Sequence, residues 1–465
     1  MIVIARVTLH NMLSIEQSCY WMASSTFEYE PPLEGTHRAD IAIVGAGLTG
    51  LWTAVFLKEM APDLEITLLE QGMAGYGGSG RNAGMIDVTI DHSHALAIAH
   101  FGFEESRKMA RLGIENIEEM IAFLSAENIE CDLERNGRFF VALNAAHIAE
   151  SQESLKIADR LNIPGWRWLD KEEIQQEVHS PLYLGGVFSP GAAILNPFKL
   201  VQGLKSFLKS RNVKIYERTR VETLAAGEIG CERGSVKAAK IIVATDAFTH
   251  HLLPALLSRF IPLYDYILVS EPLTAEQQEA IGWRKRQGIT DGRTFFNYYR
   301  LTADNRILFG TSEAKYYSAN RVGPEFDHST VHYEALHDSF LRHFPQLASL
   351  QFPFAWGGPI ASTTRLTPFF GAAHNGQVLY ALGFTGHGLG TTRIAAKVLA
   401  HRTLDQPTEL FDLKMVREKP FPYPPEPFRS LAVKLVTRSL RRVDAGESPG
   451  FLLKLLNWLG IGFSS

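Results

Sequence analysis

The segment GAGLTG at 45–50 constrains the fold of this chain more than any other feature. It directly follows ADIAIV at 39–44, a short apolar run rich in β-branched residues that predicts a buried strand. Gly45, Gly47 and Gly50 fall on the GxGxxG spacing. In that spacing the first glycine makes a tight turn, the second admits backbone N–H groups to a pyrophosphate, and the third lets the helix pack close to the strand.

The residues that follow extend this pattern into a strand–helix–strand unit. A helix that opens with Leu48 and Thr49 points the positive end of its dipole at a bound anion. LEITLLE at 64–70 predicts a second strand that ends in Glu70, with Gln71 directly after it. A carboxylate at that place suits a ribose 2′-hydroxyl and repels a 2′-phosphate. A glycine-rich turn in an unrelated unit is the alternative, but the acid in register favours a dinucleotide site.

Composition narrows the class of protein. The 465 residues suffice for two or three domains, and 46% hydrophobic with 21% charged residues is typical of a soluble globular protein. A formal net charge of −4 excludes a general nucleic-acid binder. Cys19, Cys131 and Cys231 stand far apart, so we expect neither a disulfide framework nor a metal site. The apolar start, 1–13, is a weak signal-peptide candidate, and we expect a cytoplasmic protein.

A second glycine-rich loop, GYGGSGRNAG at 75–84, comes soon after the predicted acid. Glycines at this density allow a ligand to approach the backbone closely, and an arginine among them can neutralise a pyrophosphate or a flavin-ring oxygen. A flexible surface loop is the alternative. The residues of this loop expected to contact a cofactor are Gly78, Ser79, Arg81, Asn82, Ala83 and Gly84.

Two later segments predict that the chain returns to the same sheet. KAAKIIVATDAF at 237–248 predicts a buried strand that closes in small residues, with Ala244 and Thr245 at its end. QVLYALGFTGHGLGTTRIAAKVLA at 377–400 predicts a strand, a glycine-rich turn and a helix. Backbone N–H groups at that helix start suit an anionic or polar ligand. The turn residues expected there are Gly386, His387, Gly388, Leu389 and Gly390.

These segments together resemble the FAD-dependent amine and amino-acid oxidoreductases typified by D-amino acid oxidase, glycine oxidase, sarcosine oxidase and gamma-glutamylputrescine oxidase. The resemblance runs from about residue 38 to about 404, with its landmarks in the family's order. Besides the segments above, the landmarks are GGVFSPGAAILNPFKLVQGL at 185–204, TRVETL at 219–224, NYYRLTADNRILFG at 297–310 and WGGPIASTTRLTPFFGA at 356–372.

The resemblance implies an α/β protein, α+β overall. Its parts would be a discontinuous Rossmann-like FAD-binding domain of the GR2 type and a substrate domain with a mainly antiparallel sheet. We expect the FAD-binding domain at 38–128, 185–260 and 355–404, and the substrate domain at 129–184 and 261–354. An N-terminal extension, 1–37, and a Pro-rich linker with a basic amphipathic tail, 405–465, flank the two domains.

The resemblance also implies FAD as the cofactor. Val221 would contact the adenine through its backbone, and the turn at 386–390 would face the pyrimidine end of the flavin. Relatives with covalent flavin use a His near the second glycine-rich loop or a Cys in the WGGPIASTTRL segment. This chain has Arg81 and no cysteine there, so we expect non-covalent FAD. The further residues expected beside the cofactor are Ala244, Thr245 and Gly357.

Departures from the family bear on the substrate. Glycine-oxidase-like relatives hold the substrate carboxylate with an arginine early in the WGGPIA stretch, which this chain lacks. Typical alpha-amino acids are therefore disfavoured substrates. Some amine-oxidising relatives carry an acid where this chain has Arg365. Arg293, Arg300 and Arg365 are candidates to meet an anionic group on the substrate.

Four residues are candidates for contact with the reacting amine: His387, Asp265, Tyr299 and Arg300. His387 would stabilise negative charge on the reduced ring, contact the substrate, or cap the helix start. Asp265 lies in an apolar strand, where a lone carboxylate is costly, so it would pair with a substrate ammonium or with a structural arginine. Alternation puts Tyr299 on one face of its strand and Tyr298 with Arg300 on the other. One face would roof the substrate cavity, and aromatic packing is the alternative.

These features favour an FAD-dependent oxidoreductase that dehydrogenates a small primary or secondary amine to an imine, which water hydrolyses to a carbonyl. Polyamine-like amines, N-methyl amino acids and aminophosphonates stay open as substrates, and dioxygen or another molecule would accept the electrons. The alternative is an FAD-binding protein without amine turnover, acting in assembly or as a membrane-associated electron-transfer partner.

The C-terminal tail carries a local excess of positive charge. Between Lys414 and Arg442 stand eight basic residues and two acids. LAVKLVTRSLRR and FLLKLLNWLG are short amphipathic segments of the kind that anchor a protein to a membrane surface. Packing on the protein's own surface or at a dimer contact is the alternative, which we favour. The oligomeric state stays open.

Overall fold

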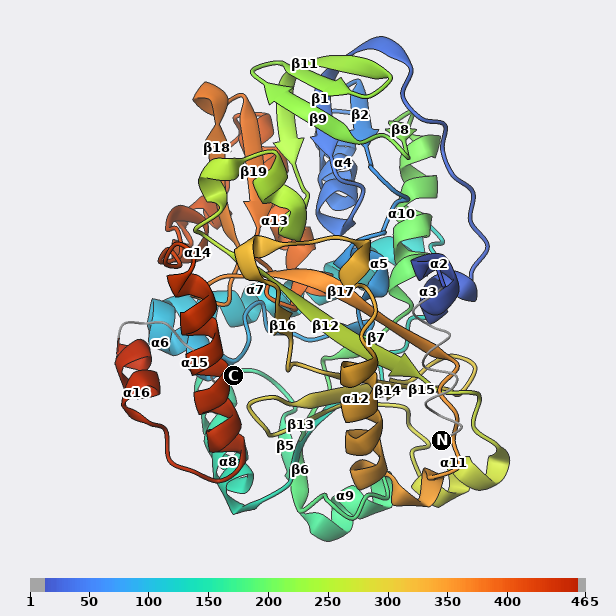
Figure 1. Cartoon of the computed structure of the whole chain (residues 1–465), viewed down its shortest axis with the longest axis vertical. Helices are drawn as coiled ribbons and strands as arrows, with labels where there is room; N and C mark the ends of the chain where they lie inside the picture. Colours follow the sequence, from blue (N-terminus) through green and yellow to red (C-terminus); the bar gives the residue numbers. More distant parts are fainter. Residues whose placement is uncertain (1–12, 459–465) are drawn as a thin grey trace.

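The computed structural model describes residues 13–458, and it divides into an upper and a lower half, each built on one sheet (Figure 1). Nearly all of the apolar start (1–12) and the end of the tail (459–465) lie outside the described residues. The upper half holds an eight-stranded sheet and the lower half a nine-stranded one.

The upper sheet is the expected Rossmann-like unit. β1 pairs in parallel with β2 and β11, and β8 and β19 add one parallel strand on either side. β18 pairs with β19 in the antiparallel direction, so the order is β18-β19-β11-β1-β2-β8. β9 and β10 form an antiparallel extension. The strands are β1 (Gly35–Val44), β2 (Ile66–Leu69), β8 (Lys214–Tyr216), β9 (Val221–Ala225), β10 (Glu228–Cys231), β11 (Gly234–Val243), β18 (Phe369–Ala373) and β19 (Val378–Leu382).

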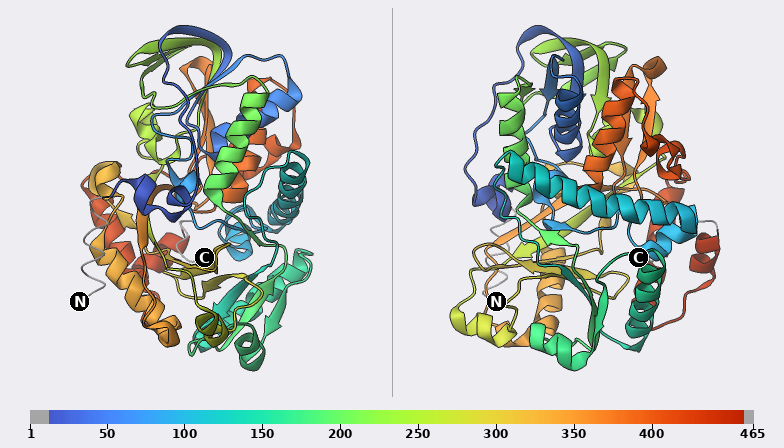
Figure 2. Two further views of the ribbon diagram at one scale, coloured as in Figure 1. Left: turned by 90° about the vertical axis from the view of Figure 1, so that its right-hand side faces the viewer. Right: turned by 180° about the vertical axis from the view of Figure 1, so that it is seen from behind.

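Helices cover this sheet and bury its main core. α4 (Leu48–Met60) is apolar on nearly every side because it packs between its sheet and neighbouring helices. α7 (Phe103–Ala126) turns Ile117, Met120 and Leu124 inward and crosses the back of the molecule between the two halves (Figure 2). The other helices around the upper half are α5 (Gly78–Arg81), α6 (His94–Phe101), α10 (Pro197–Ser210), α13 (Gly388–Thr403) and α14 (Lys414–Arg417).

The lower sheet is mainly antiparallel, as expected for a substrate domain. Its one parallel pair among the described strands joins β13 to β4. Helix α12 (Thr330–His343) packs on one face, so the opposite face is left for the cavity between the halves. Its strands are β4 (Arg138–Ala142), β5 (Arg167–Leu169), β6 (Gly185–Ser189), β12 (Ile261–Val269), β13 (Gly288–Asp291), β14 (Asn297–Leu301), β15 (Ile307–Thr311), β16 (Lys315–Tyr316) and β17 (Phe354–Ser362). The remaining elements near it are β3 (Met85–Ile86), β7 (Ala193–Ile194), α8 (Ala145–Arg160), α9 (Lys171–Glu177) and α11 (Ala275–Ile281).

Two domain boundaries lie at other residues in the structure than the sequence predicts. Strand β6 pairs with β4 and β5, and β17 pairs with β12 over its whole length, so both belong to the lower sheet. The returns to the Rossmann-like unit therefore come after 189 and after 362, not at 185 and 355. Pairing between strands far apart in sequence decides this, and neither strand's own residues signal it.

The two ends of the described chain pack onto this frame. Short helices α2 (Ile15–Ser18) and α3 (Tyr20–Ala23) lie against the lower sheet, and the Trp21 indole donates a hydrogen bond of 2.8 Å to the Asn82 carbonyl. At the other end α15 (Phe428–Asp444) and α16 (Phe451–Trp458) form a helical pair beside the cavity (Figure 1).

Candidate functional site

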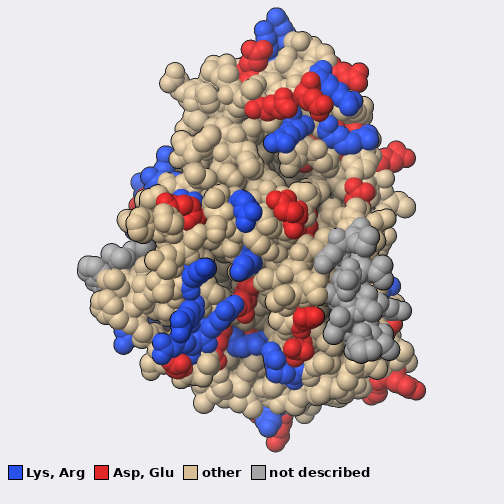
Figure 3. Space-filling model, in the orientation of Figure 1, with Lys and Arg blue, Asp and Glu red and all other residues tan. Residues whose placement is uncertain are grey.

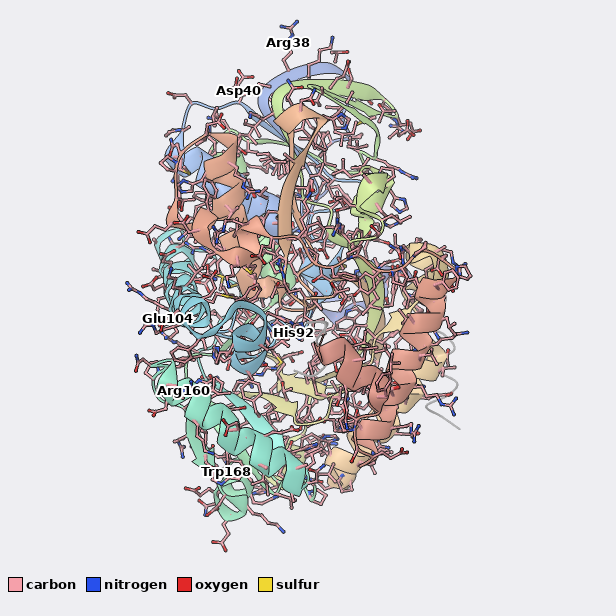
Figure 4. All side chains as sticks on the ribbon, turned by 90° about the vertical axis from the view of Figure 1, so that its left-hand side faces the viewer. Arg38, Asp40, His92, Glu104, Arg160 and Trp168 are labelled. Carbon is pink, nitrogen blue, oxygen red and sulfur yellow. The ribbon has the colours of Figure 1, made fainter. Side chains whose placement is uncertain are left out.

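One large cavity lies between the two sheets, with a volume of about 1050 Å³. That volume lies at the upper end of the range of about 300–1,000 Å³ typical of ligand pockets, so it has room for a cofactor together with a substrate. Residues from both sheets, from the 75–84 loop and from the tail helices line it. Figure 4 shows His92, one of its lining residues, at the level where the two halves meet.

The turn between β1 and α4 needs its glycines. Gly45 has φ +105°, and a Cβ there would lie 2.6 Å from the Ala244 carbonyl oxygen. A Cβ on Gly50 would lie 2.0 Å from the Gly45 carbonyl oxygen, so Gly50 lets the helix pack against the turn and does not itself line the cavity. Gly47 is the N-cap of α4 and does line it. The helix start thereby presents backbone N–H groups to an anion.

Glu70 directly follows β2, at the predicted ribose site. Its two carboxylate oxygens accept hydrogen bonds from the N–H groups of Ala46, at 3.0 Å, and Gly72, at 2.9 Å. Burial raises the pKa of this carboxyl. Gln71 and Val221 line the same end of the cavity, so the residues expected at the adenosine end lie together.

Arg81 has unsatisfied hydrogen-bonding capacity that suits a bound cofactor. Its guanidinium forms a buried ion pair of 2.8 Å with Asp327 and donates to the Gly357 carbonyl at 2.9 Å. Its Nε and Nη2 are buried without a hydrogen-bond partner, and the side chain lines the cavity. Thr392 Oγ1 is another buried, unpaired polar atom on the cavity lining. Buried polar atoms are normally paired, so these donors fit the polar edge of a dinucleotide or flavin.

The glycine-rich turn before α13 brings two histidines together. Gly386 has φ +86° and leads into His387, whose ring stacks on that of His92 at a centroid distance of 4.3 Å. Burial lowers the pKa of His387 well below its usual value and that of His92 to about 4, so both imidazoles are neutral. His387 and the turn line the cavity as expected. His92 was missed because no sequence motif includes it.

Strand β12 lines the cavity with the candidate residue Asp265. Leu263, Asp265 and Ile267 line the cavity in alternation. The Asp265 carboxylate accepts hydrogen bonds from the Tyr298 hydroxyl at 2.5 Å and from the Tyr266 N–H at 2.7 Å. Burial raises the pKa of Asp265 to about 7 against the effect of these bonds. Among residues 13–458, no Lys, Arg or His side chain forms an ion pair with Asp265. The structural arginine that we considered as its partner is therefore not found in that part of the chain.

Arg138 and Asp87 line the cavity and were not predicted. They form an ion pair of 3.0 Å, and Arg138 also donates to the Thr290 hydroxyl. Burial lowers the pKa of Arg138. Arg138 is the first residue of β4, and alternation along a strand does not tell which of its faces meets a cavity.

Asp246 is a further cavity residue that sequence reasoning missed. Its carboxylate accepts from the N–H groups of Gly383, at 2.9 Å, and Ala361, at 3.2 Å. Burial raises its pKa to about 6. Asp246 directly follows Ala244 and Thr245, which were predicted at the cofactor. The motif therefore predicted this part of the cavity correctly, but it did not identify Asp246 as a lining residue.

Two of the four catalytic candidates do not reach the cavity. Tyr299 is fully buried in the core on the α12 side, where its hydroxyl bonds that of Tyr183 at 2.6 Å. Arg300 is fully buried and donates to the carbonyls of Gly84, at 2.9 Å, and Leu195, at 2.6 Å. Aromatic packing therefore describes Tyr299, and Tyr298 is the tyrosine that faces the cavity.

Besides Gly50, two other residues expected to contact the cofactor, Gly84 and Gly357, do not reach the cavity. A Cβ on Gly84 would lie 2.0 Å from the Leu195 carbonyl oxygen, and one on Gly357 would lie 2.6 Å from the Tyr266 ring. Neither residue lines the cavity. The remaining expected cofactor residues do: Gly45, Gly47, Leu48, Thr49, Glu70, Gln71, Gly78, Ser79, Arg81, Asn82, Ala83, Val221, Ala244, Thr245, Gly386, His387, Gly388, Leu389 and Gly390.

The tail helices pack on the protein and wall the cavity. The Asp444 carboxylate accepts hydrogen bonds from the N–H groups of Thr294, at 2.7 Å, and Phe295, at 2.9 Å. Buried Val436 and Leu440 pack with Phe295. Lys and Arg side chains gather on the outer face over α15 (Figure 3). Packing on the protein, the alternative we favoured for the tail, is therefore what the described part of the tail shows.

No helix in the described part of the chain is long and apolar enough to cross a membrane. Among residues 13–458, no group of three or more His, Cys, Asp and Glu side chains is arranged to hold a metal ion.

Comparison with known proteins agrees with this geometry. The chain is 26% identical over 411 residues to the probable oxidoreductase OrdL of Haemophilus influenzae, covering 84% of this chain and 90% of that one. It is 27% identical over 391 residues to the gamma-glutamylputrescine oxidoreductase of Escherichia coli, covering 83% and 88%. The glycine oxidase structure from Geobacillus kaustophilus shares the fold, with a TM-score of 0.68, 18% identity and coverage of 82% and 99%. The family described as DAO, FAD dependent oxidoreductase, matches residues 40–402, and the chain belongs to this family.

Proposed function

We propose that this protein dehydrogenates the C–N bond of a small primary or secondary amine to an imine, which water hydrolyses to a carbonyl compound. The observation that carries the proposal is Asp265, a carboxylate without a cationic partner in the described chain, on the otherwise apolar β12 face of the cavity. A buried carboxylate is costly unless a cation neutralises it, and a substrate ammonium is such a cation. A relative named gamma-glutamylputrescine oxidoreductase supports an amine as substrate.

The chain's own residues would bind, orient and deprotonate the amine. Asp265 holds the ammonium, and its pKa of about 7 lets it take the proton that must leave before the amine is oxidised. Tyr298 fixes the carboxylate by its hydrogen bond. FAD, when bound, supplies the acceptor for the two electrons and the hydrogen removed from the carbon that bears nitrogen. Neutral His387 and His92 line the cavity by the turn expected at the flavin.

FAD binds without a covalent link in this proposal. Of the cysteines, Cys19 and Cys131 are buried, Cys231 lies on β10, and none of the three lines the cavity. The electrons pass to dioxygen or to another acceptor, and hydrogen peroxide release under saturating amine distinguishes the two. We propose that the reaction takes place in the cytoplasm, and cell fractionation tests that.

Anaerobic mixing of the purified flavoprotein with a panel of amines tests the proposal. The panel contains alkylamines, diamines, N-methyl amino acids and aminophosphonates at one pH. Loss of the visible flavin absorption with at least one amine, together with the matching aldehyde or ketone, is the expected result. Flavin that binds tightly and stays oxidised with every amine would contradict the proposal and favour an FAD-binding protein without turnover.

A further inference from the structure

The part of the cavity around Asp265 is lined mainly by apolar residues. Its inner wall is the β12 face, where Leu263 and Ile267 flank Asp265. The Tyr298 ring lies beside the Phe296 ring, with ring centroids 6.3 Å apart. Phe295, which directly precedes Phe296 in the chain, also lines the cavity. Phe295 in turn packs against the tail helices. We use the name apolar chamber for this region.

The C-terminal tail lines the apolar chamber beside Phe295. Lining residues on α15 are Ala432, Val433, Leu435, Val436, Thr437 and Leu440, and those on α16 are Leu452 and Leu456. The helices are fixed there by the hydrogen bonds of Asp444 to the backbone at Phe295 and by an ion pair between Arg441 and Glu313. The tail helices thus form an extended apolar surface that faces Asp265, the single acid of the inner wall.

The arginines that line the cavity belong neither to β12 nor to the tail helices. Arg81 is paired with Asp327 and Arg138 with Asp87, and Arg220 lies directly before β9 of the upper sheet. The arginines considered for an anionic substrate group are also engaged. Arg293 pairs with Asp291, Arg300 donates to backbone carbonyls, and Arg365 donates to the Pro368 and Met415 carbonyls. None of these three lines the cavity.

We infer that the substrate is an amine with an extended, uncharged apolar chain, which lies between Phe295, Phe296 and the tail helices while its nitrogen meets Asp265. This inference rests on the proposed function. A carboxylate or second ammonium at the far end of the substrate would be desolvated against the leucines and valines of the tail helices, whose lining residues carry no counter-charge, which is costly. Each methylene of an alkyl chain instead gains from burial.

The first arm of the test measures binding without turnover. Alkylamines in which the nitrogen-bearing carbon has no hydrogen cannot be dehydrogenated, so their dissociation constants are read from perturbation of the flavin spectrum of the holoprotein. The series runs from short to ten-carbon chains. Diamines and ω-amino acids of matched length, with the same fully substituted carbon next to the nitrogen that enters, are the polar controls. The expected dissociation constant falls about three- to four-fold for each added methylene until the chamber is full.

The second arm uses two substitutions on α15. Val433→Glu places a charge on the chamber wall, whereas Leu431→Glu places the same charge at a position that is 55% exposed and does not line the cavity. The ratio of dissociation constants between short and ten-carbon amines is expected to collapse at least ten-fold in Val433→Glu and to persist in Leu431→Glu. If Val433→Glu does not retain flavin, Val433→Ser is measured in its place.

The outcomes separate the inference from the proposed function. Affinity that does not rise with chain length, or that is higher for the ω-amino acid or diamine of matched length, overturns the inference. So does a ratio that changes equally in the two α15 variants. If unreactive alkylamines bind with the expected dependence but no oxidisable amine bleaches the flavin, the chamber stands and the proposed amine dehydrogenation fails.

Discussion

The Tyr298 hydroxyl donates a hydrogen bond of 2.5 Å to the Asp265 carboxylate, and the two side chains face the cavity from neighbouring regions of the lower sheet. Burial raises the pKa of Asp265 to about 7, while the bond from Tyr298 opposes that rise. The pair therefore holds a carboxylate that can change protonation near neutral pH and meets no cation from the described chain.

Protonation of Asp265 should limit amine oxidation at low pH. Only the carboxylate form binds an ammonium, so kcat/KM is expected to fall about tenfold per pH unit below pH 7 and to level off above it. Asp265→Asn should remove this acid limb and lower kcat/KM at pH 8 roughly 10- to 100-fold, the value of a charge-assisted hydrogen bond. A variant that keeps the limb would show that another group titrates.

Tyr298→Phe should move the acid limb to higher pH. The lost hydroxyl stabilises the charged form of Asp265, so its removal is expected to raise the apparent pKa by about one unit. Tyr299→Phe is the matched control, because Tyr299 bonds Tyr183 in the core and does not line the cavity. Equal pH profiles for the two variants would contradict the assignment of Tyr298 to the site.

Arg300→Met should weaken folding and leave the substrate specificity unchanged. The substitution leaves the buried Leu195 carbonyl without its donor and removes one of the two donors to the Gly84 carbonyl, which also accepts from the Leu195 N–H. This loss is expected to cost about 2 kcal/mol in the free energy of unfolding. Denaturant unfolding of the holoprotein measures this. A wild-type unfolding curve combined with a tenfold change in amine KM would instead place Arg300 at the substrate.

Denaturation should release all of the FAD. No cysteine lines the cavity, and the residue in the second glycine-rich loop at the place considered for covalent attachment is Arg81. After unfolding and ultrafiltration the flavin is expected in the filtrate, where its fluorescence distinguishes FAD from FMN. Colour that stays with the polypeptide would show a covalent link, and His92 and His387 would be the first positions to examine by peptide mapping.

Local sequence signals were sufficient for the dinucleotide half of the molecule. The strand at β1, the glycine turn, α4 and Glu70 are contiguous, so the geometry that joins them is short-range and each residue's type constrains it. The same holds for the turn before α13.

The other parts of the site depend on contacts between residues that are far apart in the sequence. Alternation in β14 separated Tyr299 from Tyr298, but only the packing of α12 on one face shows that Tyr298 is the one at the cavity. Asp246 and the His92–His387 stack join segments that no motif links. The tail was expected to pack somewhere, but its place as a cavity wall depends on Asp444 meeting a loop about 150 residues earlier in the chain, a contact with no local signature.

Isotopic substitution at the carbon that bears the amine nitrogen tests the central claim most directly. The measurement is the rate of anaerobic flavin reduction by the best amine of the panel, with hydrogen or deuterium at that carbon. Dehydrogenation of the C–N bond predicts that deuterium slows the loss of flavin absorption several-fold and that the same amine yields its carbonyl product in equal amount to the flavin reduced. Flavin reduction by a 2-hydroxy acid and by no amine would contradict the claim.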